Sequence, residues 1–416
     1  MRYRQFTALW TAMGLALYAA SPAVATASTT ETKLSNSLKF SSDDGNFKMQ
    51  LGGRLMADAA WYNQDNVKLD GQNGTEFRRA RLFVKGTMYG VWHYKAQYDF
   101  AASDEIKDAY IRYTGFEPLR ITVGQFKQPS SLEDLTSSKY ITFMERALPN
   151  AFATGRRIGL GVDRDTDHYT LAASVYGQNA DSSSTGDEGY GVGARGTWAP
   201  WNEEGRVLHL GLWGAWEQPN DVDAGGGTTD QELRFRERPE SHITSTRLVN
   251  TGEMSQVDNF TKYGLEAAAV MGPFSVQSEY ISTTVQTDDP AISSDPDFSG
   301  WYVYGSWFLT GESRPYKHGT FGRVKPKSIV GAGGTGAWEV AVRYSSLDLH
   351  DSGVQGGEED NITVGVNWYA TSHVRFMANY IHANADPFTQ EASLNVAPNQ
   401  NDDSPDIFQV RAQIDF

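Results

Sequence analysis

The chain ends on the segment Phe408-Gln-Val-Arg-Ala-Gln-Ile-Asp-Phe416, in which apolar and polar residues alternate strictly. The even-numbered positions carry Phe, Val, Ala, Ile and Phe, and the odd-numbered positions carry Gln, Arg, Gln and Asp. A period of two is that of a β-strand, because successive side chains of a strand point to opposite faces. This segment therefore predicts a strand with one apolar and one polar face.

The same alternation recurs along the chain, for example over 92–100, 338–345 and 362–369. We expect strands near residues 47–58, 77–88, 91–100, 107–114, 119–126, 157–164, 168–176, 189–198, 206–217, 260–271, 273–284, 300–309, 337–347, 360–370, 373–384 and 406–416. They make an even number, sixteen, as a closed antiparallel barrel with both ends on one side requires. The sequence thus indicates an all-β chain.

Composition excludes several classes of protein. The 416 residues include 41 Gly, 11 Trp, 20 Tyr and 20 Phe, no Cys, and a formal charge of −15. No apolar run of about 18 residues exists beyond the N-terminus, which argues against membrane-spanning helices. The missing Cys excludes a disulfide framework, and the net acidity argues against a nucleic-acid-binding protein.

The first 27 residues have the features of a secretory signal peptide. Arg2 and Arg4 precede an apolar stretch over 6–20, and small residues follow at Ala23-Val-Ala25 and Ala25-Thr-Ala27. Export without Cys points to a Gram-negative envelope. We expect residues 28–46 to form a polar periplasmic arm and residues 47–416 to form one barrel domain.

The strands suit an outer-membrane barrel better than a soluble sandwich. Several of them end in an aromatic residue on the apolar face, as a girdle at the lipid interface requires: Trp61, Trp92, Trp368 and Tyr380. We therefore predict a transmembrane antiparallel β-barrel in the bacterial outer membrane, with its apolar face against the membrane lipids and polar side chains in the lumen. Segments 127–156 and 348–359 are expected to be extracellular loops, the former folding inward, and 310–336 an ordered periplasmic extension.

The sequence offers no enzymatic site. Its eight His residues show no nucleophile-elbow or metal-ligand spacing. Glycine-rich pieces such as 331–336 lack the strand-to-helix context of a phosphate loop. We predict no catalytic residue, no cofactor and no metal site.

Basic residues cluster against the acidic background. Parity places Arg54 and Arg79 in the lumen, whereas Arg78 falls on the lipid-facing parity and needs a bulge or a position above the membrane. The long loop after the fifth strand carries Lys127, Lys139 and Arg146, and the sequence Arg234-Phe-Arg236-Glu-Arg238 aligns three guanidiniums if it is extended. Aligned like charges repel without a partner. An anion is a suitable partner, because rings of Arg and Lys select anions in pores, although charges that contact water or lipopolysaccharide at the rim remain an alternative.

The order and spacing of short motifs resemble those of the phosphate-selective porin O/P family across the mature chain. The motifs are Leu51-Gly-Gly-Arg54, Phe77-Arg-Arg-Ala80, Val123-Gly-Gln-Phe-Lys127-Gln-Pro129, Leu135-Thr-Ser-Ser-Lys139, Phe143-Met-Glu-Arg146, Arg234-Phe-Arg-Glu-Arg-Pro-Glu-Ser241, Trp307-Phe-Leu-Thr-Gly-Glu312 and the terminal Phe416.

The resemblance implies a homotrimer of sixteen-stranded barrels, each constricted by its infolded third loop and passively conducting phosphate, pyrophosphate or short polyphosphate. It implies two groups of anion-binding residues. Arg54, Arg78, Arg79, Lys127 and Lys139 would form the constriction, with Arg146 in the same loop, and Arg234, Arg236 and Arg238 would form a ladder leading to it.

Two departures from the family pattern concern anion preference. Ser130 stands where we expect an aromatic residue, and Arg81 stands where we expect an uncharged one. A wider neck with an extra charge would suit a longer anion. Two other functions remain open: a structural or adhesive barrel, for which the acidic residues Asp402, Asp403 and Asp406 speak, and a general diffusion porin.

Overall fold

A computed structural model describes residues 33–34, 37–63, 73–101, 105–181, 186–225, 228–386 and 404–416. The expected signal peptide, most of residues 28–36, and the acidic pair Asp402 and Asp403 lie outside the described residues. Among the helices of the described part, none is long and apolar enough to cross a membrane.

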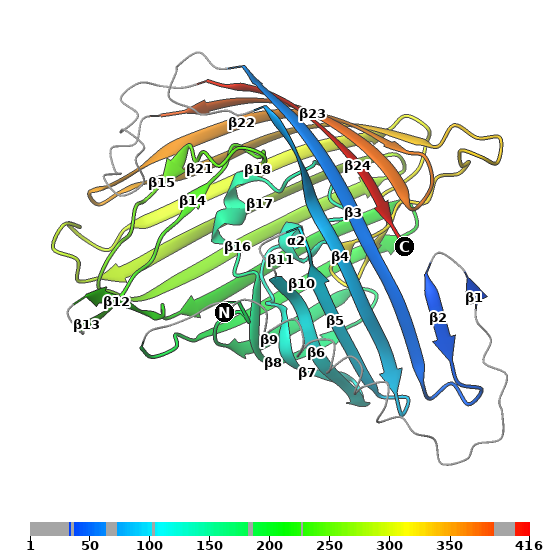
Figure 1. Ribbon diagram of the computed structural model, residues 1–416, viewed down its shortest axis with the longest axis horizontal. Coiled ribbons are helices and arrows are strands. Elements are labelled where there is room, and N and C mark those ends of the chain that lie inside the picture. Colours follow the sequence, from blue (N-terminus) through cyan, green and yellow to red (C-terminus); the bar gives the residue numbers. More distant parts are fainter. Residues whose placement is uncertain are drawn as a thin grey trace, which may run out of the picture.

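Sixteen antiparallel strands form a closed barrel (Figure 1), which confirms the predicted fold class. The barrel strands are β3 (Lys48–Asn63), β4 (Gly74–Met88), β5 (Trp92–Asp99), β6 (Glu105–Phe116), β7 (Leu119–Lys127), β8 (Arg156–Asp165), β9 (Tyr169–Tyr176), β10 (Gly191–Glu203), β11 (Arg206–Glu217), β16 (Val257–Met271), β17 (Phe274–Thr287), β18 (Asp297–Phe308), β21 (Ala337–Asp351), β22 (Val354–Tyr369), β23 (Val374–Ala385) and β24 (Asp406–Asp415). Each pairs with the next, and β24 pairs with β3 to close the ring. Each of the sixteen expected strands overlaps one of them.

Shorter elements complete the structure, and two of them, β1 (Lys33–Leu34) and β2 (Leu38–Ser41), extend the barrel sheet. The others are α2 (Leu132–Leu135), the 3₁₀ helix η1 (Leu148–Phe152), β12 (Asp221–Gly225), β13 (Thr228–Gln231), β14 (Arg236–Glu237), β15 (Val249–Asn250), β19 (Tyr316–Lys317) and β20 (Thr320–Phe321). Within the expected periplasmic arm, β2 pairs with β3 at Leu38 and Leu51.

The alternation places apolar side chains outside and polar ones inside. On β4 the side chain of Leu82 is exposed, whereas those of Arg79 and Arg81 are buried. The chain closes where the Phe416 carbonyl accepts from the Gly53 N–H at 3.0 Å. A Cβ on Gly52 would lie 2.5 Å from that carbonyl oxygen, so the close approach of the last residue requires glycine at this position.

The predicted loop 348–359 is wrong, because β21 and β22 run on to Asp351 and Val354 and leave only a two-residue turn. Ser352 and Gly353 make this turn with positive φ. Polar residues such as Asp348 and Glu358 lie in the extended parts of these strands. A strand that extends beyond the lipid meets water on its outer face, so the apolar alternation ends before the strand does.

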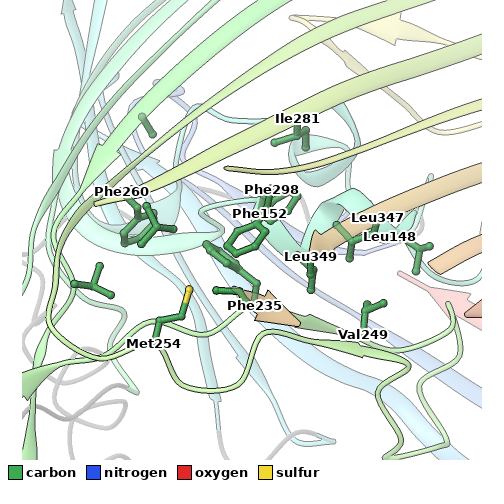
Figure 2. Close-up of a cluster of buried hydrophobic side chains, with 14 of the residues drawn as sticks. Leu148, Phe152, Phe235, Val249, Met254, Phe260, Ile281, Phe298, Leu347 and Leu349 are labelled. Atoms are coloured by element: carbon green, nitrogen blue, oxygen red, sulfur yellow. The ribbon is translucent and has the colours of Figure 1, made fainter. Parts of the chain in front are cut away.

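The inward face is not uniformly polar, which differs from the sequence expectation. A buried apolar cluster joins β11, β16, β17, β18, β21 and β22 to η1 and to loop 218–256 (Figure 2). We call it the lumen cluster; it comprises Leu148, Phe152, Trp213, Ala215, Phe235, Val249, Met254, Val257, Phe260, Ile281, Val285, Phe298, Leu347, Leu349 and Val354. Phe152 and Phe235 meet edge to face with ring centroids 5.1 Å apart. Apolar burial therefore anchors two loops to the inner wall.

The connection 310–336 is ordered, as expected, but it also contacts inward-facing side chains. Tyr316 Oη lies 2.6 Å from His209 Nδ1 on β11, and Arg195 Nη2 on β10 donates to the Gly319 carbonyl at 2.9 Å. This segment thus packs against the inner wall at β10 and β11.

Candidate anion path

The third loop, residues 128–155, contacts strands from both sides of the barrel. The N–H groups of Leu132 and Glu133 donate to the Glu279 carboxylate on β17 at 2.9 and 2.8 Å. On the other side, the Met144 N–H donates to Asn379 Oδ1 on β23 at 2.8 Å. These contacts fix the loop between walls that are far apart in sequence.

A cavity of about 310 Å³ lies between this loop and the wall of β3 to β8. Its basic lining residues are Arg54, Arg79, Arg81, Lys95, Arg112, Lys127, Arg146 and Arg156. Among the described residues that line it, Asp108 is the only acid. Asp108 accepts from Lys95 Nζ at 2.5 Å and from Arg156 Nε at 2.8 Å. Basic groups therefore outnumber acidic ones in the lining. Carboxylates outside the lining pair with several of these cations: Glu145 with Arg79, Asp99 with Arg81, and Asp134 with Lys127 and Arg146.

Arg54 fits its predicted place. Its side chain is buried in the lumen, lines the cavity and donates from Nη1 to Ser138 Oγ of the third loop at 2.6 Å. Within the described part of the chain it forms no ion pair with a carboxylate. Its guanidinium therefore meets the third loop through a neutral hydroxyl.

Arg78 and Arg79 both point inward, because β4 carries a bulge at Arg78. Met56 pairs with Arg79 but Ala57 pairs with Phe77, so Arg78 is the extra residue of the bulge. The bulge alternative is thereby confirmed. Both guanidiniums meet Glu145 of the third loop: Arg78 Nε and Nη2 donate to it at 2.9 Å each, and Arg79 Nη2 lies 3.6 Å from Oε2.

Glu145 has a third cationic neighbour, Arg411 of β24, whose Nη2 lies 2.7 Å from Oε1. Arg411 is also held by Asp58 on β3 at 2.6 and 2.7 Å. Burial would raise the pKa of Glu145, but the guanidiniums of Arg78, Arg79 and Arg411 hold that pKa well below its ordinary value. Glu145 is therefore a carboxylate in the ionised form.

Lys127 and Arg146 share one carboxylate. Asp134 Oδ1 lies 3.2 Å from Lys127 Nζ and 3.6 Å from Arg146 Nη2. Arg146 also donates to the carbonyl oxygens of Glu133, Asp134 and Thr136, which would otherwise lack partners after the short helix α2. Lys127 and Arg146 thus both line the cavity, while Arg146 also shapes the loop.

Lys139 lies beyond this cavity, next to the end of β24. Its Nζ is 3.0 Å from Asp415 Oδ2 and 5.2 Å from the ring centroid of Tyr140. With Lys39, Lys85 and Arg323 it lines a further cavity of about 290 Å³. The structure therefore separates Lys139 from the cavity that Arg54 and Arg79 line.

The three arginines of loop 218–256 lie on a segment that crosses the barrel. Arg234 donates to Asn250 Oδ1 at 2.9 Å, and Arg236 is exposed in β14. Only Arg236 of the three falls within a strand, and Phe235 between them is buried in the lumen cluster. Further along this segment, His242 lies 2.9 Å from Glu76 on β4, so the loop spans from β11 to the opposite wall.

Sequence reasoning did not name several basic residues as site residues. Lys95 and Arg112 line the cavity, and strand parity could have found them, since both lie on inward faces. In loop 218–256, burial and the neighbouring Arg238 lower the pKa of Arg247 to about 10. The loop gave no signal for Arg247, because it has no periodicity there.

Arg81 and Ser130, the two departures from the family pattern, both have hydrogen-bond partners in the structure. Arg81 donates from Nε to Asp99 Oδ2 at 2.6 Å, so its charge is offset by a neighbour on β5. Ser130 is buried, and its N–H donates to the Gln128 carbonyl at 2.8 Å. Arg81 lines the cavity with Arg79.

Comparison with known proteins decides the family. The model of the family described as phosphate-selective porin O and P matches residues 49–416. The chain belongs to this family. It is a porin of the bacterial outer membrane, as predicted.

Two relatives support the assignment. Porin O of Pseudomonas aeruginosa is 31% identical to this porin over 424 residues, covering 92% of each chain. An uncharacterized protein of Caulobacter vibrioides is 33% identical over 374 residues, covering 86% of this porin and 73% of the relative.

Solved structures share the fold of this porin at low sequence identity. An anion-selective porin from Comamonas acidovorans has a TM-score of 0.55 at 13% identity, covering 89% of this chain and 100% of its own. The DcaP channel of Acinetobacter baumannii has a TM-score of 0.55 at 12% identity, covering 91% and 99%. The trimer form of Vibrio cholerae OmpT has a TM-score of 0.55 at 10% identity, covering 89% and 99%.

Proposed function

We propose that this porin is a passive, anion-selective channel for phosphate or for pyrophosphate and short polyphosphate. The observation that carries the proposal is the cavity between the third loop and β3 to β8, lined by eight basic residues and a single acid. Guanidinium groups suit phosphate because their planar fork offers two parallel charge-assisted hydrogen bonds.

The path of the anion follows the basic residues in three stages. Arg234, Arg236 and Arg238 on loop 218–256 would attract it from outside. Arg54, Arg78, Arg79, Lys127 and Arg146 would bind it where the third loop folds into the lumen and narrows the pore. Beyond Lys139, a cavity of about 780 Å³ lined by Lys39, Lys48, Lys85, Arg112 and Arg120 opens below the constriction. Several weak sites in series allow an anion both to bind and to leave.

Conductance in a planar lipid bilayer tests the proposal. In potassium chloride the protein should pass chloride in preference to potassium, and inorganic phosphate added to one side should block the chloride current. Pyrophosphate in the same assay reports whether Arg81 and Ser130 favour a longer anion. Current without anion-specific block would identify a general diffusion porin, and a folded barrel without current would identify a structural or adhesive one.

We also propose that the porin is a homotrimer embedded in outer-membrane lipid. The trimer form of the structurally similar OmpT supports this assembly, and the exposed apolar side chains on the barrel exterior supply a surface for lipid and for neighbouring subunits. A band on unheated denaturing gels should run at trimer mass. A monomer band without cross-linking counts against it.

A further inference from the structure

Glu145 is an acidic residue in the midst of the basic residues that the proposed channel uses. Its carboxylate receives four contacts from three wall arginines: Arg78 donates to both oxygens, Arg411 donates to Oε1, and Arg79 lies 3.6 Å from Oε2. Its side chain is 14% exposed. The arrangement resembles the fork of donors that a bound phosphate would receive.

The position of Glu145 lies between two groups of basic residues. Arg79, its neighbour on one side, lines the cavity with Arg54. On the other side it pairs with Arg78, which lies two residues along β4 from Glu76, the partner of His242 in loop 218–256 at 2.9 Å. Glu145 thus lies where the cavity lining approaches loop 218–256, on the route that the proposed function gives the anion.

We propose that Glu145 is a tethered counter-anion that competes with the permeating anion for Arg78 and Arg79, and thereby sets how tightly the channel binds phosphate. This inference rests on the proposed anion channel. Chloride offers one charge and no second acceptor atom, so it competes poorly with a carboxylate that already satisfies the fork. A polyvalent oxyanion offers more charge and several oxygens, so it can share these arginines with Glu145.

The carboxylate of Glu145 is not what holds the loop in place. The main chain on both sides of it is fixed separately: the Met144 N–H donates to Asn379 Oδ1 at 2.8 Å, and Arg343 Nη1 donates to the Glu145 carbonyl at 3.1 Å. Arg411 keeps Asp58 as a partner when Glu145 is neutralised. Removing the charge therefore changes the competition for Arg78 and Arg79 more than it changes the fold.

Glu145→Gln tests the proposal in planar bilayers, with inorganic phosphate blocking the chloride current. The amide has nearly the same shape without the charge, so phosphate should block roughly tenfold more tightly, the scale of a hydrogen bond to a charged group. Arg78→Gln should weaken the phosphate block, because it removes a charged donor and leaves the negative charge of Glu145 with one fewer cationic partner. A matched control, Glu203→Gln, removes an exposed acid at the end of β10 and should leave the block unchanged.

The direction in which each substitution changes the phosphate block tests the proposal. If Glu145 only anchors the loop, Glu145→Gln and Arg78→Gln both weaken the block, and that result overturns the proposal, as does an unchanged block in Glu145→Gln. Should Glu145→Gln fail to insert, Glu145→Asp withdraws the carboxylate by one methylene and should tighten the block part-way, and weakening or no change overturns the proposal. Absence of phosphate block in the unmodified protein would instead refute the phosphate channel itself.

Discussion

Lys139 and Asp415 form an ion pair that joins the third loop to the last strand of the barrel, with Nζ 3.0 Å from Oδ2. The same carboxylate accepts a hydrogen bond from Arg323 Nη1 at 3.0 Å, and a second from Nη2. One acidic side chain thus holds a cation from the third loop and another from the connection 310–336. Lys139 is therefore a paired cation beside the pore, and its replacement changes both the local charge and this junction.

Lys139→Glu should shift the channel toward cation selectivity and abolish the block of chloride current by phosphate. The new carboxylate would lie beside Asp415, and two like charges this close are destabilising. Its negative charge would also repel the permeating anion. Arg79 and Lys127 remain, so a complete reversal is not required. The reversal potential across a potassium chloride gradient measures the shift. An unchanged anion preference would remove Lys139 from the anion path.

Arg79→Ala should weaken the block by phosphate by about tenfold or more, because the variant loses a charged donor that lines the cavity. Lys317→Ala is the matched control, since Lys317 is exposed on the connection 310–336. Titration of the chloride current with phosphate compares the two variants. Equal block in both would show that the inward assignment of Arg79 carries no anion-binding role.

Phe235→Ala should release loop 218–256 while leaving the barrel folded. Phe235 packs on Phe152, Phe260 and Phe298 in the lumen cluster, and truncation of a buried Phe costs about 3–5 kcal/mol. The hydrogen-bonded barrel wall does not depend on this contact. Limited proteolysis should therefore cut the loop faster, while the heat-modifiable gel shift stays intact. Loop cleavage at the original rate would contradict the anchoring role.

The pH dependence of anion selectivity should show the titration of Glu237 in loop 218–256. Burial raises the pKa of this carboxyl from 4.5 to about 7. A raised pKa means that its contribution to stability is full below pH about 4.5 and is lost as pH rises through about 7. Above that range its negative charge also offsets Arg238 and Arg247.

The chloride reversal potential should therefore report weaker anion selectivity at pH 8 than at pH 5. Chloride is the right probe, because phosphate itself changes charge in this window. Glu237→Gln should flatten the pH dependence between these values. A variant that keeps the full pH dependence would assign the titration to other groups.

Much of the barrel could be predicted from the sequence. Lipid outside the barrel requires apolar side chains at alternate positions of each strand. The local pattern therefore indicates that a segment is a strand and which of its side chains face inward, and the number of such segments predicts the number of strands. That is why Arg54 and Arg79 could be placed on the inward face, and why Arg78 needed the bulge that the structure contains. The polar hairpin of β21 and β22 could not be predicted, because the pattern ends where the lipid ends.

The sequence by itself determined the alternation of faces, the number of strands and the clustering of basic residues. Only the tertiary structure decided what each of those cations contacts. Arg78 and Arg79 pair with the Glu145 carboxylate and Lys139 pairs with Asp415. Arg54 instead donates to the Ser138 hydroxyl. The reason is separation along the chain. Arg411 and Asp58 lie 353 residues apart and become neighbours only because β24 pairs with β3 when the barrel closes. No local pattern encodes such a pairing, and loops that fold against the inner wall have no periodicity to reveal their partners.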